Sequence, residues 1–85
     1  MTRKKIHVTA EDIAKGQPAV EMLCPIALAI KRETNLTSVR VNKKSWSTRG
    51  FNRRLGVAAI RFIEDFDSHD TVQPFTFITE VPDAG

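Results

Sequence analysis

The clearest periodic pattern in this sequence lies between residues 55 and 67. Apolar residues recur there at intervals of 4, 3, 1 and 3 positions, at Leu55, Ala59, Phe62, Ile63 and Phe66. This spacing places all of them on one face of an amphipathic helix. We expect this helix to follow directly on residues 53–54 and to end within residues 67–70.

Two shorter helices are predicted nearer the N-terminus. Thr9 is a suitable N-cap, and Asp12 three positions later completes an approximate capping box. The glycine and proline of residues 16–18 end this helix after about two turns. The next helix begins at Pro25, because a first-turn residue needs no amide hydrogen. Residues 26–30 are all apolar, so this helix is expected in the centre of the domain.

Alternating apolar and polar residues predict strands at residues 6–8, 38–42 and 72–81. In the last of these, one face carries Phe75, Phe77, Thr79 and Val81. Residues 43–54 show no clear period, and they are either the returning strand of a hairpin or a loop. The predicted order of elements is therefore β-α-α-β-(β)-α-β.

This order indicates an α+β fold, with a small, mostly antiparallel sheet and helices packed on one face. The chain has 85 residues, which is enough for one domain covering residues 1–85. We expect residues 1–5 to be a flexible basic tail and residues 82–85 a flexible end. The predicted core consists of Ile13, Ile26, Leu28, Ala29, Ile30, Val39, Val41, Leu55, Ala59, Phe62, Ile63, Phe66, Phe75 and Phe77.

Charge changes this picture because it is unevenly distributed. The whole chain carries +3, but residues 31–54 contain eight cations against one anion, and residues 64–85 contain six anions and no cation. Such blocks are either two solvated faces that pair within the fold, or a sign that the basic region binds an anionic partner. They also favour a homo-oligomer, most simply a dimer, in which acidic and basic regions of two copies meet.

Residues 43–54 combine cations with aromatic rings, hydroxyls and a glycine. Cations bind phosphates and an aromatic face stacks on a base, so this mixture is typical of a site for an anionic aromatic ligand. Core filling is the simpler interpretation of each aromatic ring taken alone. The predicted ligand-binding residues are Arg49, Arg53, Arg54, Lys43, Lys44, Trp46 and Phe51.

The predicted position of the last helix supports this hypothesis. Arg53 and Arg54 at its N-terminal end would oppose the helix dipole, and an anion bound there would relieve the repulsion. This support depends on the helix beginning close to Arg54.

Other candidate chemistry is sparse. His7, His69 and Cys24 include no closely spaced ligand pair, so no metal site and no cofactor are predicted. A small nuclease would need both histidines in one cleft. Cys24 precedes a helix, where it is either an activated thiolate or, more simply, a buried structural residue. The single cysteine suits a reducing cytosol, and we expect no signal peptide and no membrane span.

Several segments resemble a widespread set of small uncharacterised tailed-bacteriophage proteins. Residues 8–18 resemble their opening (V-T-x-x-x-I-x-x-G-x-P), residues 24–29 their C-P-[IV]-A-L-A element, and residues 61–67 and 73–77 their closing helix and P-F-x-F strand. The resemblance covers most of the chain apart from residues 43–54. Many such proteins have further cysteines just before the C-P element, and their absence here opposes a shared metal site. The resemblance implies a phage protein in the cytoplasm of a bacterial host and no particular activity.

These observations lead to three hypotheses. The first is a non-enzymatic module for host takeover or anti-defence, which captures a phosphate-bearing ligand, either a defence signalling nucleotide or nucleic acid. A nucleotide requires a closed pocket, whereas nucleic acid requires only an open basic groove. The second is a protein–protein inhibitor of a host protein, with Trp46, Phe51 and nearby arginines as anchors. The third is a small nuclease or hydrolase.

Overall fold

The computed structural model describes residues 2–82. In that part of the chain, three helices and five strands follow one another as β1 (Thr2–Val8), α1 (Ala10–Lys15), α2 (Pro25–Thr34), β2 (Arg40–Val41), β3 (Ser45–Thr48), β4 (Phe51–Arg54), α3 (Val57–Asp67) and β5 (Phe75–Val81). The predicted α+β class and order of elements are confirmed. The ambiguous residues 43–54 form the β3–β4 hairpin.

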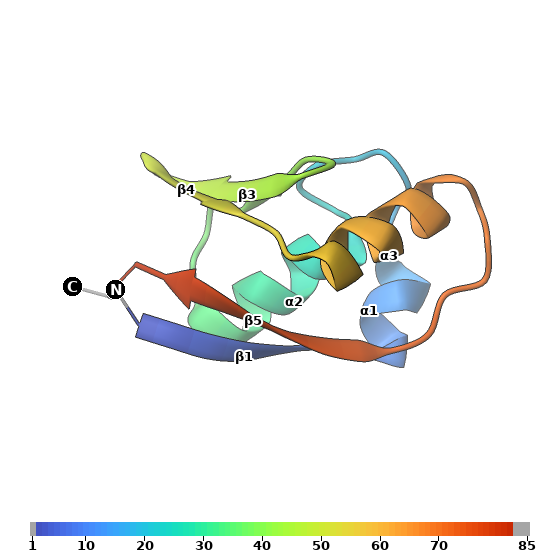
Figure 1. The fold of residues 1–85 in the computed structure, drawn as a ribbon, viewed down its shortest axis with the longest axis horizontal. Coiled ribbons are helices and arrows are strands. Elements are labelled where there is room, and N and C mark those ends of the chain that lie inside the picture. The colour runs from blue at the N-terminus through green and yellow to red at the C-terminus, as the bar shows by residue number, and fades with distance from the viewer. Residues whose placement is uncertain (1, 83–85) are drawn as a thin grey trace.

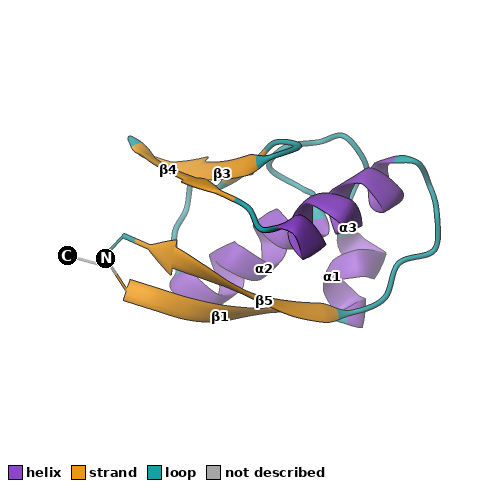
Figure 2. Cartoon of the chain, in the orientation of Figure 1, coloured by secondary structure: helices purple, strands orange, loops and turns teal. Residues whose placement is uncertain are grey.

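The antiparallel strands divide into two sheets. β1 pairs with β5 along its whole length, and β2, β3 and β4 form a meander. In Figure 1 the β3–β4 hairpin lies above the β1–β5 pair, with α2 between them and α1 and α3 toward the other end of the long axis. Figure 2 shows strands both above and below α2, so this helix lies between the two sheets.

The first strand is longer than expected. Residues 2–5, predicted to be a flexible tail, pair with β5, where Arg3 lies opposite Glu80 and Lys4 opposite Thr79. A run of basic residues shows no apolar alternation, so the sequence did not reveal this pairing. Of the predicted flexible ends, Met1 and residues 83–85 lie outside the described residues, and Pro82 is half-buried.

Most of the predicted core is confirmed. Ile26, Ala29, Ile30, Val39, Val41, Leu55, Ala59, Phe62 and Ile63 are buried, and Ile13, Leu28, Phe66, Phe75 and Phe77 are half-buried. The core also contains residues that the prediction omitted, namely Ile6, Val8, Cys24, Ala27, Trp46 and Val81. Trp46 joins the two sheets, because its Nε1–H donates a hydrogen bond to Thr79 Oγ1 at 3.0 Å.

The predicted capping box at α1 is also confirmed. The Thr9 amide donates to Asp12 Oδ2 at 2.9 Å, and the Asp12 amide donates to Thr9 Oγ1 at 3.2 Å. Asp12 is buried and also accepts a hydrogen bond from Arg32 of α2, so one carboxylate fastens the two helices together. The chain leaves α1 at Gly16, where an added Cβ would lie 2.6 Å from Cδ of Pro25.

Candidate anion-binding site

The structure separates the predicted site residues into an inner and an outer group. Trp46 is 0% exposed and its ring centroid lies 5.5 Å from that of Phe51, which is half-buried against the core. The prediction was that Trp46 or Phe51 provides an aromatic face; Trp46 fills the core instead, and Phe51 keeps part of its surface exposed. The Trp46 ring is buried because hairpin pairing turns it, with Val41 opposite, toward the space between the two sheets.

The predicted helix-terminus site is also wrong. Arg53 and Arg54 are the last residues of β4, and α3 begins at Val57 after its N-cap Gly56. The hairpin prevents an earlier start, because the Leu55 amide donates to the Lys44 carbonyl at 2.8 Å. Neighbouring strand residues leave the strand on opposite sides, so the two arginines do not form a pair at a helix terminus, although both line a hollow at the edge of this strand. Arg53 lies opposite buried Trp46 in the ladder and forms an ion pair with Glu80.

The predicted cations Lys43, Lys44, Arg49 and Arg54 lie on or beside the outer face of the β2–β4 sheet, together with Arg40, which the prediction did not include. Arg40 and Arg54 belong to the strands, the β2–β3 turn carries Lys43 and Lys44, and Arg49 lies at the tip of the hairpin; all five are exposed. We call this set the basic face. No acidic residue occurs between residues 34 and 63 to neutralise it.

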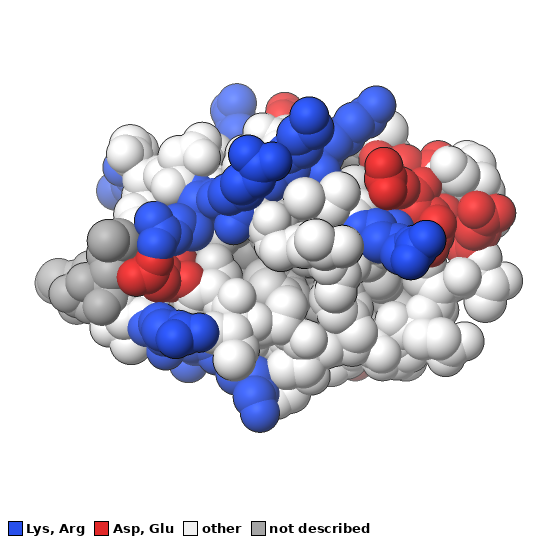
Figure 3. All heavy atoms as spheres, in the orientation of Figure 1, with Lys and Arg blue, Asp and Glu red and all other residues white. Residues whose placement is uncertain are grey.

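The acidic residues gather elsewhere. In Figure 3 many of the blue side chains lie over the β3–β4 hairpin and one end of the β1–β5 sheet, whereas most of the red ones lie over the C-terminal end of α3. Glu64, Asp65, Asp67 and Asp70 belong to that end of the helix and the turn after it. The basic and acidic blocks of the sequence therefore also lie apart on the surface of the folded protein.

A hollow of about 340 Å³ lies between the two sheets, beside the basic face. It is lined by Arg3 of β1, Arg53 and Arg54 of β4, and Ile78, Thr79 and Glu80 of β5. We call it the arginine hollow. Arg3 is not among the predicted site residues, because residues 2–5 were expected to form a flexible tail. The pairing of these residues with β5 places Arg3 opposite Glu80.

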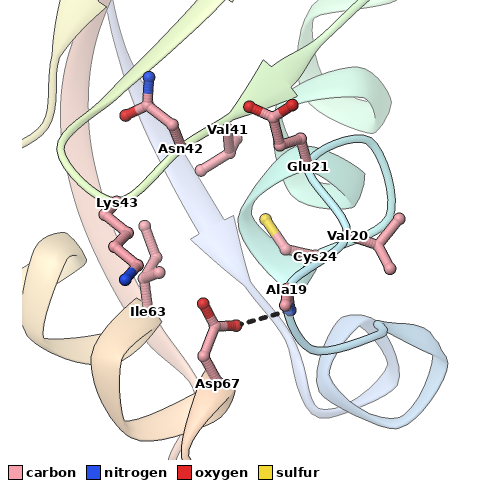
Figure 4. A pocket seen from close by; sticks show the side chains of 9 residues that line it. All are labelled: Ala19, Val20, Glu21, Cys24, Val41, Asn42, Lys43, Ile63 and Asp67. Atoms are coloured by element: carbon pink, nitrogen blue, oxygen red, sulfur yellow. Dashed lines mark hydrogen bonds between the residues drawn. The ribbon is translucent and has the colours of Figure 1, made fainter.

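A second, smaller hollow of about 210 Å³ surrounds Cys24 (Figure 4). The Cys24 Sγ accepts a hydrogen bond from the Ala27 amide at 3.4 Å and so caps α2. Burial raises the pKa of this thiol, which keeps it protonated and unreactive at neutral pH. At the rim, Asp67 accepts a hydrogen bond from the Ala19 amide at 2.9 Å. These features favour the structural interpretation of Cys24.

The two histidines lie in different places. His7 lines a hollow beside Pro74 and Phe75, whereas His69 lines another beside Phe66 and Val72. They do not form an acid–base pair in one cleft. Within residues 2–82, no group of three or more histidine, cysteine, aspartate or glutamate side chains is placed to hold a metal ion.

Two further findings bear on function. No helix in the described part of the chain is long and apolar enough to cross a membrane. No protein-family model, curated protein or solved structure matches the chain. The assignment of a function therefore rests on the geometry and charge of the surface.

Proposed function

We propose that the protein is a non-enzymatic module that binds nucleic acid by its phosphate backbone. The observation that carries the proposal is the basic face, where five exposed cations gather without an acidic residue between positions 34 and 63. Lysine and arginine contacts to phosphates release condensed counterions, which supplies most of the affinity in sequence-independent binding. The acidic end of α3 is repelled by the same ligand and orients the molecule on it.

The shape of the basic face favours nucleic acid over a free nucleotide. A nucleotide requires an enclosed pocket with a surface for its base, but Trp46 lies inside the core. The outer face carries small polar side chains instead, such as Ser47 and Asn52, which alternate with the inward residues of the hairpin. Such side chains donate hydrogen bonds to phosphate and sugar oxygens without reading sequence.

The backbone at the hairpin tip supports a functional use of Arg49. Arg49 has φ 32° and Gly50 has φ 79°, so both turn residues lie in the left-handed region. Asparagine or glycine is preferred at the first of these positions, and arginine there costs conformational energy. Strain of this kind gathers at functional sites. The cation at this exposed tip is well placed to reach a phosphate.

The proposed setting follows from the resemblance to tailed-phage proteins. In the cytoplasm of a bacterial host, a small module of this kind would act in host takeover or anti-defence by occupying nucleic acid. Sequence-independent binding suits such a role, because no particular site has to be found.

The proposal is tested by binding of a short labelled DNA duplex over a range of salt concentrations. The logarithm of affinity should fall with the logarithm of salt with a slope of about −0.9 per phosphate contact, or about −4.5 for the five cations of the basic face. Lys44→Gln with Arg49→Gln should weaken binding and reduce the slope by about 2. The matched control, Lys15→Gln with Arg61→Gln, removes the same charge from α1 and α3 and should have little effect.

Two results would contradict the proposal. Equal losses in both double variants would mean that net charge alone matters and that the basic face is not a site. Absence of binding even at low salt would remove nucleic acid as the ligand.

A protein–protein inhibitor is the second candidate, on a different surface from the one predicted. The loop between α1 and α2 exposes Val20, Met22 and Leu23 to 37%, 39% and 38%. Neighbouring apolar side chains of this kind serve as anchors in protein interfaces, whereas the buried Trp46 does not. Val20→Ser with Leu23→Ser would abolish inhibition of a host protein and leave duplex binding unchanged.

We also propose that the protein forms a homodimer. The molecule is elongated, with extents of 37 × 21 × 20 Å, and its two ends carry opposite charge. An antiparallel arrangement of two copies lets the acidic end of each meet the basic face of the other, which closes the assembly with two-fold symmetry. Sedimentation at low salt should show a dimer that dissociates as salt rises. A monomer at every salt concentration would contradict it.

A further inference from the structure

The arginine hollow differs from the basic face in being concave and in drawing on both sheets. Arg3 comes from β1, Glu80 from β5, and the two other arginines from β4. β5 pairs with β1, and β4 pairs with β3, so the hollow lies between the edges of two separate sheets. A concave surface of this kind suits a small chemical group, whereas the flat basic face suits a long nucleic-acid backbone.

The charges in the hollow are only partly balanced. Glu80 forms an ion pair with Arg53. Within the part of the chain that the structure describes, neither Arg3 nor Arg54 forms an ion pair. The residues that line the hollow include three arginines and one glutamate, which gives a net charge of +2 around a volume of about 340 Å³. Like charges held together in this way are unfavourable until an anion joins them.

The remaining charge indicates the kind of anion. Guanidinium groups bind phosphate and carboxylate oxygens through paired hydrogen bonds. A phosphate monoester carries about −1.5 to −2 at neutral pH, close to the unbalanced charge, whereas a backbone diester carries only one negative charge. Ile78 at the rim is 56% exposed and offers an apolar contact to whatever the phosphate is attached to.

We infer that the arginine hollow is a second site, which takes a phosphate monoester through Arg3 and Arg54, and that Glu80 competes with this ligand for Arg53. Thr79 is buried and is not assigned to the ligand set, because its hydroxyl accepts a hydrogen bond from Trp46 and donates one to the Glu80 carbonyl. The end of a nucleic-acid strand and a free mononucleotide both supply such a group. The first of these sources rests on the proposed function, and the second does not.

The inference is tested by titration with inorganic phosphate, with adenosine 5′-monophosphate, and with one duplex bearing either a 5′-phosphate or a 5′-hydroxyl. The phosphorylated duplex should bind about tenfold more tightly than the hydroxyl form, the gain expected from charge-assisted hydrogen bonds. Glu80→Gln should tighten inorganic phosphate binding severalfold, because it frees Arg53 and raises the local charge.

The variants Arg3→Gln and Arg54→Gln should each bring the two duplexes close to equal affinity. Arg40→Gln is the matched control, since it removes one charge from the basic face outside the hollow; it should weaken both duplexes equally and preserve their ratio. Tighter binding of the duplex end than of the mononucleotide identifies the strand end as the ligand, and the reverse identifies the free nucleotide.

Failure of this inference can be distinguished from failure of the proposed function. Equal affinity for both duplexes, together with an inorganic phosphate affinity that Glu80→Gln leaves unchanged, would overturn the arginine hollow as a site while leaving the basic face intact. Phosphate binding that responds to Glu80→Gln, without any duplex binding, would support the hollow and reject the nucleic-acid function.

Discussion

The charged residues around α1 and α2 differ from those of the β2–β4 sheet in whether they meet a partner. Arg32 contacts Asp12 and Glu33, and Lys15 contacts Glu11. In the described β2–β4 sheet, by contrast, Arg53 alone forms an ion pair, with Glu80 of β5. The α1–α2 region contains charged residues of both signs, whereas the β2–β4 sheet contains cations and no acidic residue.

This difference separates charges that hold the fold from charges that are free for a ligand. A paired charge in a half-buried place contributes to stability, and its removal leaves a partner unsatisfied. Unpaired surface cations repel one another and contribute little or nothing to stability. Charge removal should therefore lower stability in the α1–α2 region and affect only binding on the basic face.

The largest expected effect is on the stability of the whole domain, which destabilises both regions together. Phe62 of α3 is buried, with its ring centroid 4.8 Å from that of Phe75 and 6.1 Å from that of Phe66. Phe62→Ala should cost about 3–5 kcal/mol of unfolding free energy, as for other buried aromatic residues. Urea unfolding followed by tryptophan fluorescence measures this. A nearly unchanged midpoint would mean that this face of α3 is not part of the core.

Asp12→Asn removes the ion pair between Asp12 of α1 and Arg32 of α2. The variant keeps the shape of the side chain but removes the charge that holds Arg32, and the free energy of unfolding should fall by about 1–3 kcal/mol. Glu11→Gln is the control, because Glu11 pairs with Lys15 in full solvent exposure. If the two variants melt alike, the buried pair does not fasten α1 to α2.

Arg49→Asn should raise the free energy of unfolding, whereas Asp12→Asn should lower it. Asparagine tolerates the left-handed conformation that Arg49 adopts, so the variant should be more stable by up to about 1 kcal/mol while binding duplex less tightly. Arg40→Asn, on a strand with ordinary backbone geometry, should weaken binding without any gain in stability. A loss of stability in Arg49→Asn would show that the arginine side chain holds the hairpin.

Arg53 and Arg54 allow a paired and an unpaired charge to be compared in two adjacent residues. Arg53→Gln removes the ion pair with Glu80 and should lower the unfolding free energy by about 0.2–1 kcal/mol, the range for partly exposed pairs. Arg54→Gln should leave stability unchanged. Thermal unfolding of both single variants decides this. Equal stability losses would place Arg54 among the structural charges.

The smallest expected effect is on the stability of the protein at acid pH. Burial raises the pKa of Glu33, but hydrogen bonds from His7 and the charges of His7 and Arg32 outweigh burial, so its pKa is lowered. The resulting stabilisation is fully present above the ordinary glutamate pKa of about 4.3 and is lost as pH falls through the lower pKa of the folded protein. Glu33→Gln should remove this part of the acid dependence, which urea unfolding of the two proteins at a series of acid pH values measures.

Local signals in the sequence predicted much of the fold. The capping box at Thr9, the first-turn proline at Pro25 and the apolar spacing of α3 each depend on neighbouring residues, and each is present in the structure. The start of α3 was predicted too early because Leu55 fits the helical spacing, although its amide belongs to the hairpin. Local spacing cannot reveal a hydrogen bond made by the chain 11 residues earlier.

The candidate site was harder to predict because its residues come from distant parts of the chain. The basic segment was found by composition, but composition does not tell which side chains of a short hairpin face inward. Trp46 turns toward Thr79, which follows 33 residues later. Arg3 and Glu80 meet across the β1–β5 ladder from opposite ends of the sequence. Such residues come together only when the fold is known.

The contact between Gly16 and the ring of Pro25 restricts how this sequence can change over time. An added Cβ at position 16 would lie 2.6 Å from Cδ and Cγ of Pro25 and 2.9 Å from its backbone nitrogen, so a substitution there requires a shift of the backbone at the start of α2. Gly16 follows α1 and Pro25 begins α2, and these two segments look independent when the sequence is read from end to end. In evolutionary terms, replacing Pro25 removes the ring but leaves its backbone nitrogen 2.9 Å from the added Cβ, so position 16 stays restricted to glycine whatever residue occupies position 25, unless the backbone itself shifts.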